Sequence, residues 1–253
     1  MQSWALVTGA TSGIGESFTR LLAENNYNIV LVARDLPRLQ ERAEQLQTKF
    51  KVQTHIIQAD LATDSGCGVV EQYIANNQID VLINNAGFGI NKAFTLSQLV
   101  AEQQLLDVLV RTPMRLMHVA LPLMKERNKG VLINVSSVAS FIAGGTYSAS
   151  KSYLTVLSES LHTELAGTNV KISALCPGFT RTEFHQRGRM SMKGLPSFLW
   201  LDADELVARA WSDTLKGKAI SIPGWQYQLL VFVIKRLPRS IVRKVGMRTK
   251  QRK

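Results

Sequence analysis

Tyr147 and Lys151 lie four residues apart in the stretch YSASK, residues 147–151. On a helix this spacing puts both side chains on one face, about one turn apart. A nearby ammonium favours the phenolate and lowers the pKa of a phenol from about 10. Tyr147 could then exchange a proton with a substrate oxygen near neutral pH. An ordinary, partly exposed helical pair would show the same spacing, so other residues must support this chemistry.

A glycine-rich stretch, VTGATSGIGES, occupies residues 7–17, where an apolar strand is expected to turn into a helix. Gly9, Gly13 and Gly15 permit positive φ angles and let the backbone approach a ligand closely. The new helix offers unpaired amides and a positive dipole end to a pyrophosphate. A tight structural loop would use the same residues, but the position directly after the first strand favours nucleotide binding.

The residues after the second apolar segment bear on the kind of nucleotide. Sheets that bind NAD usually carry an acidic residue there, which accepts hydrogen bonds from the ribose 2′-hydroxyl, whereas NADP calls for a cation. This sequence has Ala33 at the acidic position and then Arg34, whose guanidinium can pair with a 2′-phosphate. NADP is therefore favoured. Asp35 could bind a ribose instead, although capping of the next helix also accounts for it.

Seven short apolar runs could form the strands that position these residues. They are rich in Val, Ile and Leu without alternation, which is typical of strands buried on both faces of a parallel sheet. The segments between them have helical spacing, as in residues 36–50. The pattern predicts an α/β fold: a doubly wound parallel sheet (Rossmann fold) with helices on both faces. The predicted strands are Trp4–Val7, Asn28–Ala33, Val52–Gln58, Asp80–Asn84, Val131–Ser136, Val170–Cys176 and Ala219–Ile222.

Composition excludes several other classes. The chain has 253 residues, 45% of them hydrophobic, which suits one large α/β domain. The net charge is +11, but residues 225–253 hold nine basic and no acidic residues, which leaves +2 for the rest. Nucleic-acid binding is not expected, since basic residues would then line a recognition element. Cys67 and Cys176 form no metal motif, so no metal site is predicted. The absence of a leader favours a cytoplasmic location.

Three further stretches join the glycine turn: NNAG at 84–87, YSASK at 147–151 and PGFTRT at 177–182. With TGATSGIG at 8–15, in this order, the sequence resembles the short-chain dehydrogenase/reductase family over residues 3 to 224. The resemblance implies a Rossmann-type fold, a nicotinamide cofactor and hydride transfer between an alcohol and a ketone or aldehyde. It also implies a homodimer or homotetramer.

The resemblance assigns roles to individual residues. Tyr147 would be the acid/base, Lys151 its electrostatic partner and a ligand of the nicotinamide ribose, and Ser137 a hydrogen-bond donor to the reacting oxygen. Ser136 is the alternative if the alignment is shifted by one residue. Asn84 could instead be structural and tie neighbouring strands together. The predicted cofactor-binding residues are Gly9, Thr11, Ser12, Gly13, Ile14, Gly15, Arg34, Asp60, Leu61, Asn84, Ala86, Gly87, Tyr147, Lys151, Pro177, Gly178, Thr180 and Thr182.

Two departures from the family pattern stand out. The segment from Ser137 to Tyr147 is about three residues shorter than usual, which should widen one side of the substrate cleft. Leu109 also replaces an asparagine that supports a water relay to the lysine in many members. Because Pro113 has no N–H for the carbonyl of Leu109, that carbonyl could hold the water itself. The alternative is that Leu109 packs in the core of a protein that binds a cofactor without efficient catalysis.

The substrate end and the C-terminal end carry many large apolar side chains. The resemblance implies a mobile lid at about residues 183–217, and its apolar residues favour a lipophilic carbonyl compound, unless they pack the lid on the core. These residues, with one just before the lid, are Phe179, Phe184, Met190, Met192, Leu195, Phe198, Leu199 and Trp200.

The apolar run Leu229–Ile234 is too short to span a bilayer, which takes roughly 20 residues. The basic extension 225–253 could lie on an anionic membrane surface, anchored by Trp225, Tyr227 and Phe232. It could also cover the cleft or a subunit interface, or be a solvated terminus.

Taken together, the sequence predicts an NADP(H)-dependent carbonyl reductase or alcohol dehydrogenase, with residues 1–224 as one catalytic domain. A nucleotide-binding regulatory or scaffold protein on the same fold is the alternative, motivated by Leu109 and the altered Ser–Tyr spacing. The substrate, the direction and the stereochemistry do not follow from the residues.

Overall fold

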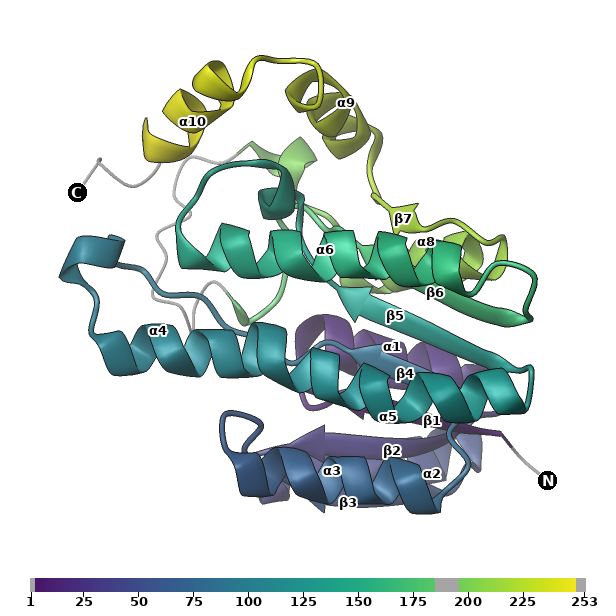
Figure 1. Ribbon diagram of the computed structural model, residues 1–253. Coiled ribbons are helices and arrows are strands. Elements are labelled where there is room, and N and C mark those ends of the chain that lie inside the picture. Colours follow the sequence, from purple (N-terminus) through teal and green to yellow (C-terminus); the bar gives the residue numbers. More distant parts are fainter. Residues whose placement is uncertain (1–2, 185–195, 249–253) are drawn as a thin grey trace.

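Seven short apolar segments form a single parallel sheet in the computed structural model, which describes residues 3–184 and 196–248 (Figure 1). The order across the sheet is β3-β2-β1-β4-β5-β6-β7, and every neighbouring pair is parallel. All seven predicted strands are confirmed: four of them are one or two residues shorter than predicted, the first is one residue longer, and the fifth is shifted by one residue. They are β1 (Trp4–Thr8), β2 (Asn28–Ala33), β3 (Thr54–Gln58), β4 (Val81–Asn84), β5 (Gly130–Val135), β6 (Val170–Leu175) and β7 (Ile220–Ser221).

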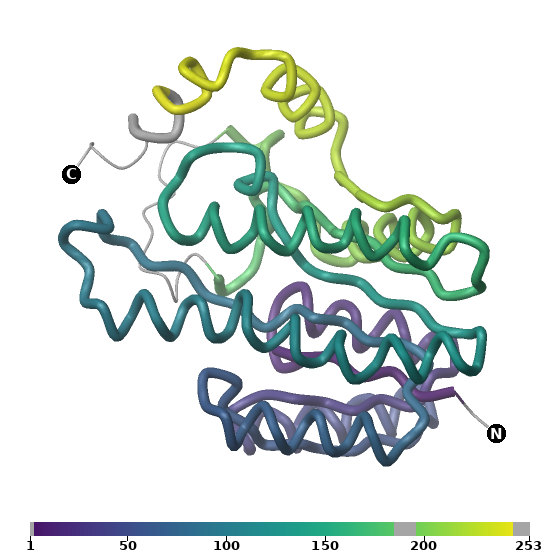
Figure 2. Tube along the Cα trace, viewed as in Figure 1, coloured from purple at the N-terminus to yellow at the C-terminus, as the bar shows by residue number. Residues whose placement is uncertain are grey.

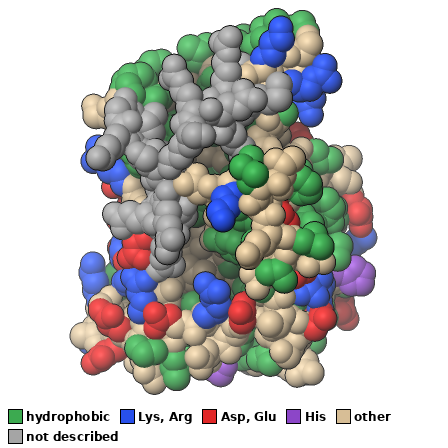
Figure 3. Space-filling model, turned by 90° about the vertical axis from the view of Figure 1, so that its left-hand side faces the viewer, with side chains coloured by type: hydrophobic (Ala, Val, Ile, Leu, Met, Phe, Trp, Pro, Cys, Tyr) green, Lys and Arg blue, Asp and Glu red, His purple; other side chains and the backbone are tan. Residues whose placement is uncertain are grey.

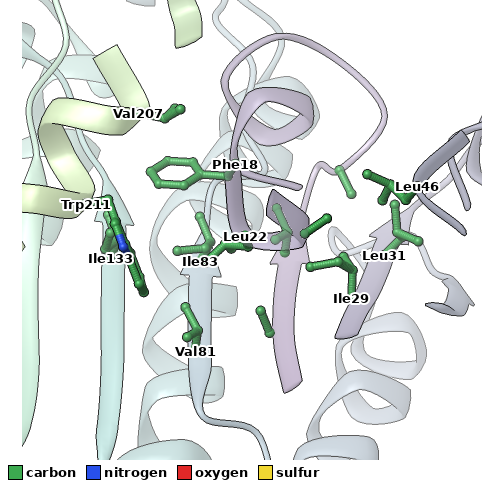
Figure 4. Close-up of a cluster of buried hydrophobic side chains, with 14 of the residues drawn as sticks. Phe18, Leu22, Ile29, Leu31, Leu46, Val81, Ile83, Ile133, Val207 and Trp211 are labelled. Carbon is green, nitrogen blue, oxygen red and sulfur yellow. The ribbon is translucent and has the colours of Figure 1, made fainter. Parts of the chain in front are cut away.

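The strands are buried on both faces because helices cover both. Ala5 and Val7 of β1 face one apolar layer, and Leu6 between them faces the other. The first layer is covered by α1 (Gly13–Glu24), α2 (Leu36–Phe50) and α8 (Ala203–Leu215). Phe18, Leu22, Val207 and Trp211 of these helices lie against Ile29, Leu31, Val81, Ile83 and Ile133 of the strands in Figure 4. The fold is therefore the predicted doubly wound α/β sheet.

The second layer holds α3 (Asp64–Asn76), α5 (Thr112–Glu126) and α6 (Thr146–Glu164). The helix α4 (Leu99–Leu106) leads into α5 through a π-helical segment, η2 (Asp107–Arg111). The described residues also form three short 3₁₀ turns: η1 (Phe94–Leu96), η3 (Val138–Phe141) and η4 (Ser197–Leu199). The strand order reverses at β1: β2 and β3 lie on one side of it in the sheet, and β4 lies on its other side. Such sheets bind ligands at the carboxyl ends of the strands next to this reversal, here β1 and β4.

Two helices follow the sheet, α9 (Trp225–Ile234) and α10 (Arg239–Arg248). The C-terminal trace runs from β7 over the side of α6 toward the end of the molecule where α4 begins (Figure 2). Within the described ranges 3–184 and 196–248, no helix is long and apolar enough to cross a bilayer.

The structure describes only part of the segment 183–217 that the sequence assigns to a lid. Residues 203–215 form α8, whose Leu206, Val207, Ala210 and Trp211 belong to the apolar layer under the sheet. This part of the predicted lid is therefore a core helix, because its apolar stripe packs on β-strands instead of over a cleft. Met190, Met192 and Leu195 lie outside the described residues.

Candidate active site

Helix α6 places Tyr147 and Lys151 at the carboxyl edge of the sheet. The helix begins after Gly145, whose φ of 78° suits glycine, so Tyr147 lies in the first turn. The Lys151 Nζ lies 5.8 Å from the centre of the Tyr147 ring and donates a 2.6 Å hydrogen bond to the carbonyl of Val135, the last residue of β5. The structure thus brings the predicted pair together at the end of a central strand.

Burial sets the protonation of this pair. Desolvation raises the pKa of Tyr147 to about 12, and contact with the Ser137 hydroxyl lowers it by a smaller amount. Desolvation also lowers the pKa of Lys151 to about 8. The expected depression of the phenol pKa is therefore wrong for this structure, because burial outweighs the hydrogen bond with Ser137 and the pKa is raised instead. Tyr147 is neutral at pH 7 and has a proton to donate.

Ser137, not Ser136, lies beside Tyr147. Ser137 is the N-cap of η3, where its Oγ accepts from the amide of Ala139 at 3.1 Å. Ser136 is buried, and its hydroxyl donates to the carbonyl of Lys151 at 2.8 Å and lies 2.7 Å from the hydroxyl of Thr155. Ser137 is therefore the serine in contact with Tyr147, while Ser136 fastens α6 to β5.

The glycine turn is closely packed. Gly9 and Gly13 have φ angles of 66° and 55°. A Cβ on Gly15 would come within 2.2 Å of the Gly9 carbonyl oxygen, so the start of α1 reaches the turn only because residue 15 has no side chain. Behind Gly13, a Cβ would lie 2.9 Å from the side chain of Thr182. Two predicted cofactor stretches, residues 8–15 and 177–182, therefore meet here.

Sequence reasoning missed two residues that hold this turn. The Thr8 hydroxyl accepts from the amides of Asn85 and Ala86 at 2.9 and 3.0 Å, and Asn85 Nδ2 donates to the carbonyl of Thr8 at 2.9 Å. These bonds lock the end of β1 to the end of β4. The sequence does contain a signal for Thr8 and Asn85, because each is a polar residue directly after a predicted apolar strand.

Two of the acidic residues considered for the adenosine half of the cofactor, Asp35 and Asp60, already accept hydrogen bonds from neighbouring backbone amides. Arg34 is exposed directly after β2, as expected for a ligand of a 2′-phosphate. Asp35 caps α2 by accepting from the amide of Arg38 at 3.2 Å, which confirms the capping alternative. Asp60 accepts from the amide of Ala62 at 3.1 Å. The sequence did not single out Arg38, which pairs with Glu183 through bonds of 3.1 and 2.8 Å.

Leu109 is buried in the π-helical segment η2, where its side chain faces Gly87. A cavity of about 10 Å³, enough for about one water molecule, lies beside Leu109 and Lys151. Asn84 also lines it. The Asn84 Nδ2 donates to Asn134 Oδ1 at 2.9 Å and so ties β4 to β5, as its structural alternative predicts, while its buried Oδ1 has no partner among the described residues.

The sequence model of the family described as short chain dehydrogenase matches residues 3–192. A hydroxysteroid dehydrogenase-like protein 1 from Gallus gallus is 29% identical over 245 residues, which cover 94% of this chain and 73% of that protein. A very-long-chain 3-oxoacyl-CoA reductase-like protein from Arabidopsis thaliana is 28% identical over 248 residues, which cover 95% of this chain and 78% of that protein.

Solved structures agree with the family match. A short-chain dehydrogenase from Sphingobium yanoikuyae in complex with NADPH has a TM-score of 0.84 at 27% identity, covering 94% of this chain and 97% of that one. A short-chain dehydrogenase/reductase from Burkholderia phymatum in complex with NAD has a TM-score of 0.80 at 21% identity, covering 94% and 96%, and shows the fold alone. The chain belongs to the short-chain dehydrogenase/reductase family of oxidoreductases, which act on hydroxyl and carbonyl groups.

Proposed function

We propose that this chain is an NADP(H)-dependent carbonyl reductase or alcohol dehydrogenase that acts on a lipophilic ketone, aldehyde or secondary alcohol. The observation that carries the proposal is the pair formed by the half-buried Tyr147 and the buried Lys151, with Ser137 beside it, at the same edge of the sheet as the glycine turn. Parallel sheets bind their ligands at this carboxyl edge.

The residues present fit a dinucleotide. The N-cap residue of α1, Ser12, makes no side-chain hydrogen bond to the first amides of the helix, which suits a pyrophosphate there. Arg34 adds an exposed guanidinium suited to a 2′-phosphate. When bound there, NADPH supplies a hydride. The residues proposed to hold it are Gly9, Thr11, Ser12, Gly13, Ile14, Gly15, Arg34, Asp60, Leu61, Asn84, Ala86, Gly87, Tyr147, Lys151, Pro177, Gly178, Thr180 and Thr182.

The side chains of the site supply the proton that carbonyl reduction requires. During carbonyl reduction, Tyr147 donates its phenolic proton to the substrate oxygen, and Ser137 donates a hydrogen bond that stabilises the negative charge developing on that oxygen. The protonated amine of Lys151 stabilises the phenolate that remains. A water in the small cavity would accept a hydrogen bond from the Lys151 amine and donate one to Asn84 Oδ1. Such a water would return a proton toward Tyr147 and replace the relay that Leu109 removes from the usual pattern.

The apolar surroundings favour a lipophilic substrate. The Phe184 ring centre lies 6.0 Å from that of Tyr147, and Phe179 and Trp200 pack against each other at 6.1 Å. The names of the two relatives refer to a very-long-chain 3-oxoacyl-CoA and to a hydroxysteroid, which both contain a large apolar part. An extended aliphatic or polycyclic ketone fits these surroundings better than a small polar one.

A panel of carbonyl compounds and alcohols, from short polar to long-chain and polycyclic, tests the proposal with both NADPH and NADH. We expect NADPH oxidation that rises with substrate apolarity and is lost in Tyr147→Phe. Tight NADPH binding without turnover on any member would instead support the regulatory or scaffold alternative. The absence of nucleotide binding would overturn both.

A specific surface feature favours a second role, contact with an anionic membrane. Trp225, Leu229, Phe232 and Val233 are exposed at i, i+4, i+7 and i+8 on α9, which puts them on one face. Exposed basic residues of α10, including Arg239 and Arg243, follow directly. In Figure 3, hydrophobic and basic side chains lie next to each other at the upper end of the molecule, where Figure 1 places α9 and α10.

Such a surface suits a cytoplasmic enzyme that takes apolar substrates from a bilayer. A homodimer or homotetramer remains our prediction for the assembly, and light scattering measures it.

A further inference from the structure

Tyr227 belongs to α9 in the C-terminal extension, but its side chain packs into the loop that follows β6. The residue is 2% exposed. A Cβ on Gly178 would come within 2.0 to 2.3 Å of three carbons of the Tyr227 ring. The ring therefore occupies the place that any side chain at position 178 would need.

The hydroxyl of Tyr227 joins two further segments. It accepts from the amide of Phe179 at 3.0 Å and donates to the carbonyl of Leu199 at 2.6 Å. The same two segments are also linked by backbone bonds, since Leu201 donates to the carbonyl of Phe179 at 2.8 Å and Arg181 to that of Leu201 at 3.1 Å. Tyr227 thus fastens the loop after β6 to the segment before α8.

The loop that Tyr227 holds reaches both halves of the proposed site. At its start, the carbonyl of Pro177 accepts from the amide of Val138 at 3.0 Å and from the hydroxyl of Ser137 at 3.5 Å. At its end, Thr182 lies against Gly13 of the glycine turn. A displacement of residues 178 and 179 would therefore also move the groups next to Ser137, where the nicotinamide is proposed to bind.

The rest of α9 packs on the same corner. The Lys235 Nζ, directly after α9, lies 5.0 Å from the ring centre of Phe141 in η3, the turn that Ser137 caps. Val231, one helical turn after Tyr227, is also buried. The helix therefore contacts the two loops that flank Ser137.

We propose that Tyr227 is a positioning residue for the nicotinamide half of the cofactor, contributed by the C-terminal extension. Its ring supports Gly178, and its hydroxyl fixes Phe179, so that residues 177–182 keep the conformation that nicotinamide binding requires. The inference rests on the proposed function, in which this loop contacts the nicotinamide.

The test uses the full chain and measures binding by calorimetry with two probes, NADP⁺ and adenosine 2′,5′-bisphosphate, which lacks the nicotinamide half. Tyr227→Phe keeps the ring but removes both hydroxyl bonds. We expect its Kd for NADP⁺ to rise about tenfold, which corresponds to about 1.4 kcal/mol, while its Kd for the bisphosphate stays within twofold of wild type. Tyr73→Phe on the distant α3 removes another partly buried hydroxyl and should change neither Kd.

A second pair of variants tests the ring. Gly178→Ala should weaken NADP⁺ binding at least tenfold, because its Cβ meets the Tyr227 ring. Combining it with Tyr227→Ala should cost less than the sum of the two single changes, since the combination relieves the collision. Strict additivity would contradict the proposed contact.

The possible outcomes separate the two proposals. Equal loss of affinity for both probes in Tyr227→Phe, or no loss for either, would overturn the role of Tyr227 and leave the proposed function standing. Failure of the wild-type chain to bind NADP⁺ would overturn the proposed function, and the role of Tyr227 with it.

Discussion

The Lys151 Nζ lies 5.8 Å from the centre of the Tyr147 ring while it donates to the carbonyl of Val135 at the end of β5. The amine is thus held by the strand and faces the phenol from one helical turn away. With the pKa of Tyr147 raised to about 12 and that of Lys151 lowered to about 8 by burial, both groups hold their protons at pH 7. This arrangement suits proton donation to a carbonyl oxygen.

The first prediction concerns the phenol itself. Tyr147→Phe should lower kcat for carbonyl reduction by about 10²- to 10⁴-fold, the usual contribution of a general acid. NADPH should still bind, because the glycine turn and Arg34 are unchanged, and quenching of protein fluorescence measures this. Tyr153→Phe is a matched control on the same helix, since Tyr153 is exposed. Retention of kcat within tenfold in Tyr147→Phe would show that another group donates the proton.

Burial of Lys151 also predicts how stability depends on pH. The pKa of this amine falls from 10.5 to about 8 on folding, so between these pH values the unfolded chain binds a proton that the folded chain has released. The free energy of unfolding should therefore gain about 3 kcal/mol from Lys151 as the pH rises through this window. Below pH 8 both states are protonated and the full cost of burying the charge remains.

Urea unfolding of wild type and Lys151→Met measures this effect. The variant should be the more stable protein at pH 7, and the gap should shrink as the pH approaches 10. Above pH 10, Tyr147 acts in the opposite sense in both chains, because its folded phenol keeps a proton that the unfolded phenol loses. A gap that stays constant between pH 7 and pH 9.5 would refute the lowered pKa of Lys151.

Much of the fold could be predicted because its signals are local. Leu6 and Val7 point to opposite faces of β1, and both are buried, so an unbroken apolar run identified a strand covered on both sides. The helical pair at residues 147 and 151 was equally visible as a spacing of four. These features depend on residues that are close together in the chain.

The features that the sequence did not give depend on contacts between distant segments. The raised pKa of Tyr147 follows from burial, which spacing does not specify. The prediction that Tyr227 anchors the chain to a membrane is wrong, because its side chain is only 2% exposed. Nothing in the neighbouring residues indicated its contact with Gly178, 49 positions earlier. Likewise α8 appeared as part of a lid because its apolar stripe does not say which surface it covers.

Cofactor choice is tested at Arg34, which is exposed directly after β2. Arg34→Leu should raise the KM for NADPH about tenfold or more through loss of a charged pair with the 2′-phosphate, and leave the KM for NADH within about twofold. Lys49→Leu, at the far end of α2, is the control. Parallel increases for both cofactors would mean that Arg34 acts on the fold and not on the phosphate.

Leu109 provides a test of the proton relay. Leu109→Asn restores the usual family residue next to the small cavity that Asn84 and Lys151 line. We expect kcat to rise, because a second polar group would hold a relay water. Thermal stability should fall, because Leu109 is 1% exposed and the substitution replaces a buried apolar side chain with a polar one. Leu105→Asn, also buried on the preceding helix, should lose stability without the gain in kcat. An unchanged or lower kcat in Leu109→Asn would count against the relay.

The C-terminal helices predict salt-sensitive binding to anionic membranes. Deletion of residues 225–253 would also remove Tyr227, so substitutions on the exposed face give a cleaner test. Arg239→Glu combined with Arg243→Glu should lower the partition coefficient on phosphatidylserine vesicles at least tenfold, since each basic residue near such a surface contributes about 1 kcal/mol.

Phe232→Ser, which removes an exposed apolar side chain from α9, should weaken binding further. Lys49→Glu combined with Lys51→Glu makes the same change of charge on α2, away from this face, and should leave most of the binding intact. Salt screens the attraction between basic side chains and anionic lipids, so wild-type binding should also fall steeply between about 0.05 and 0.5 M salt. At about 0.1 M, attraction over more than about 10 Å is already largely screened. Equal binding by the α2 and α10 variants would place the contact elsewhere on the protein or reduce it to net charge alone.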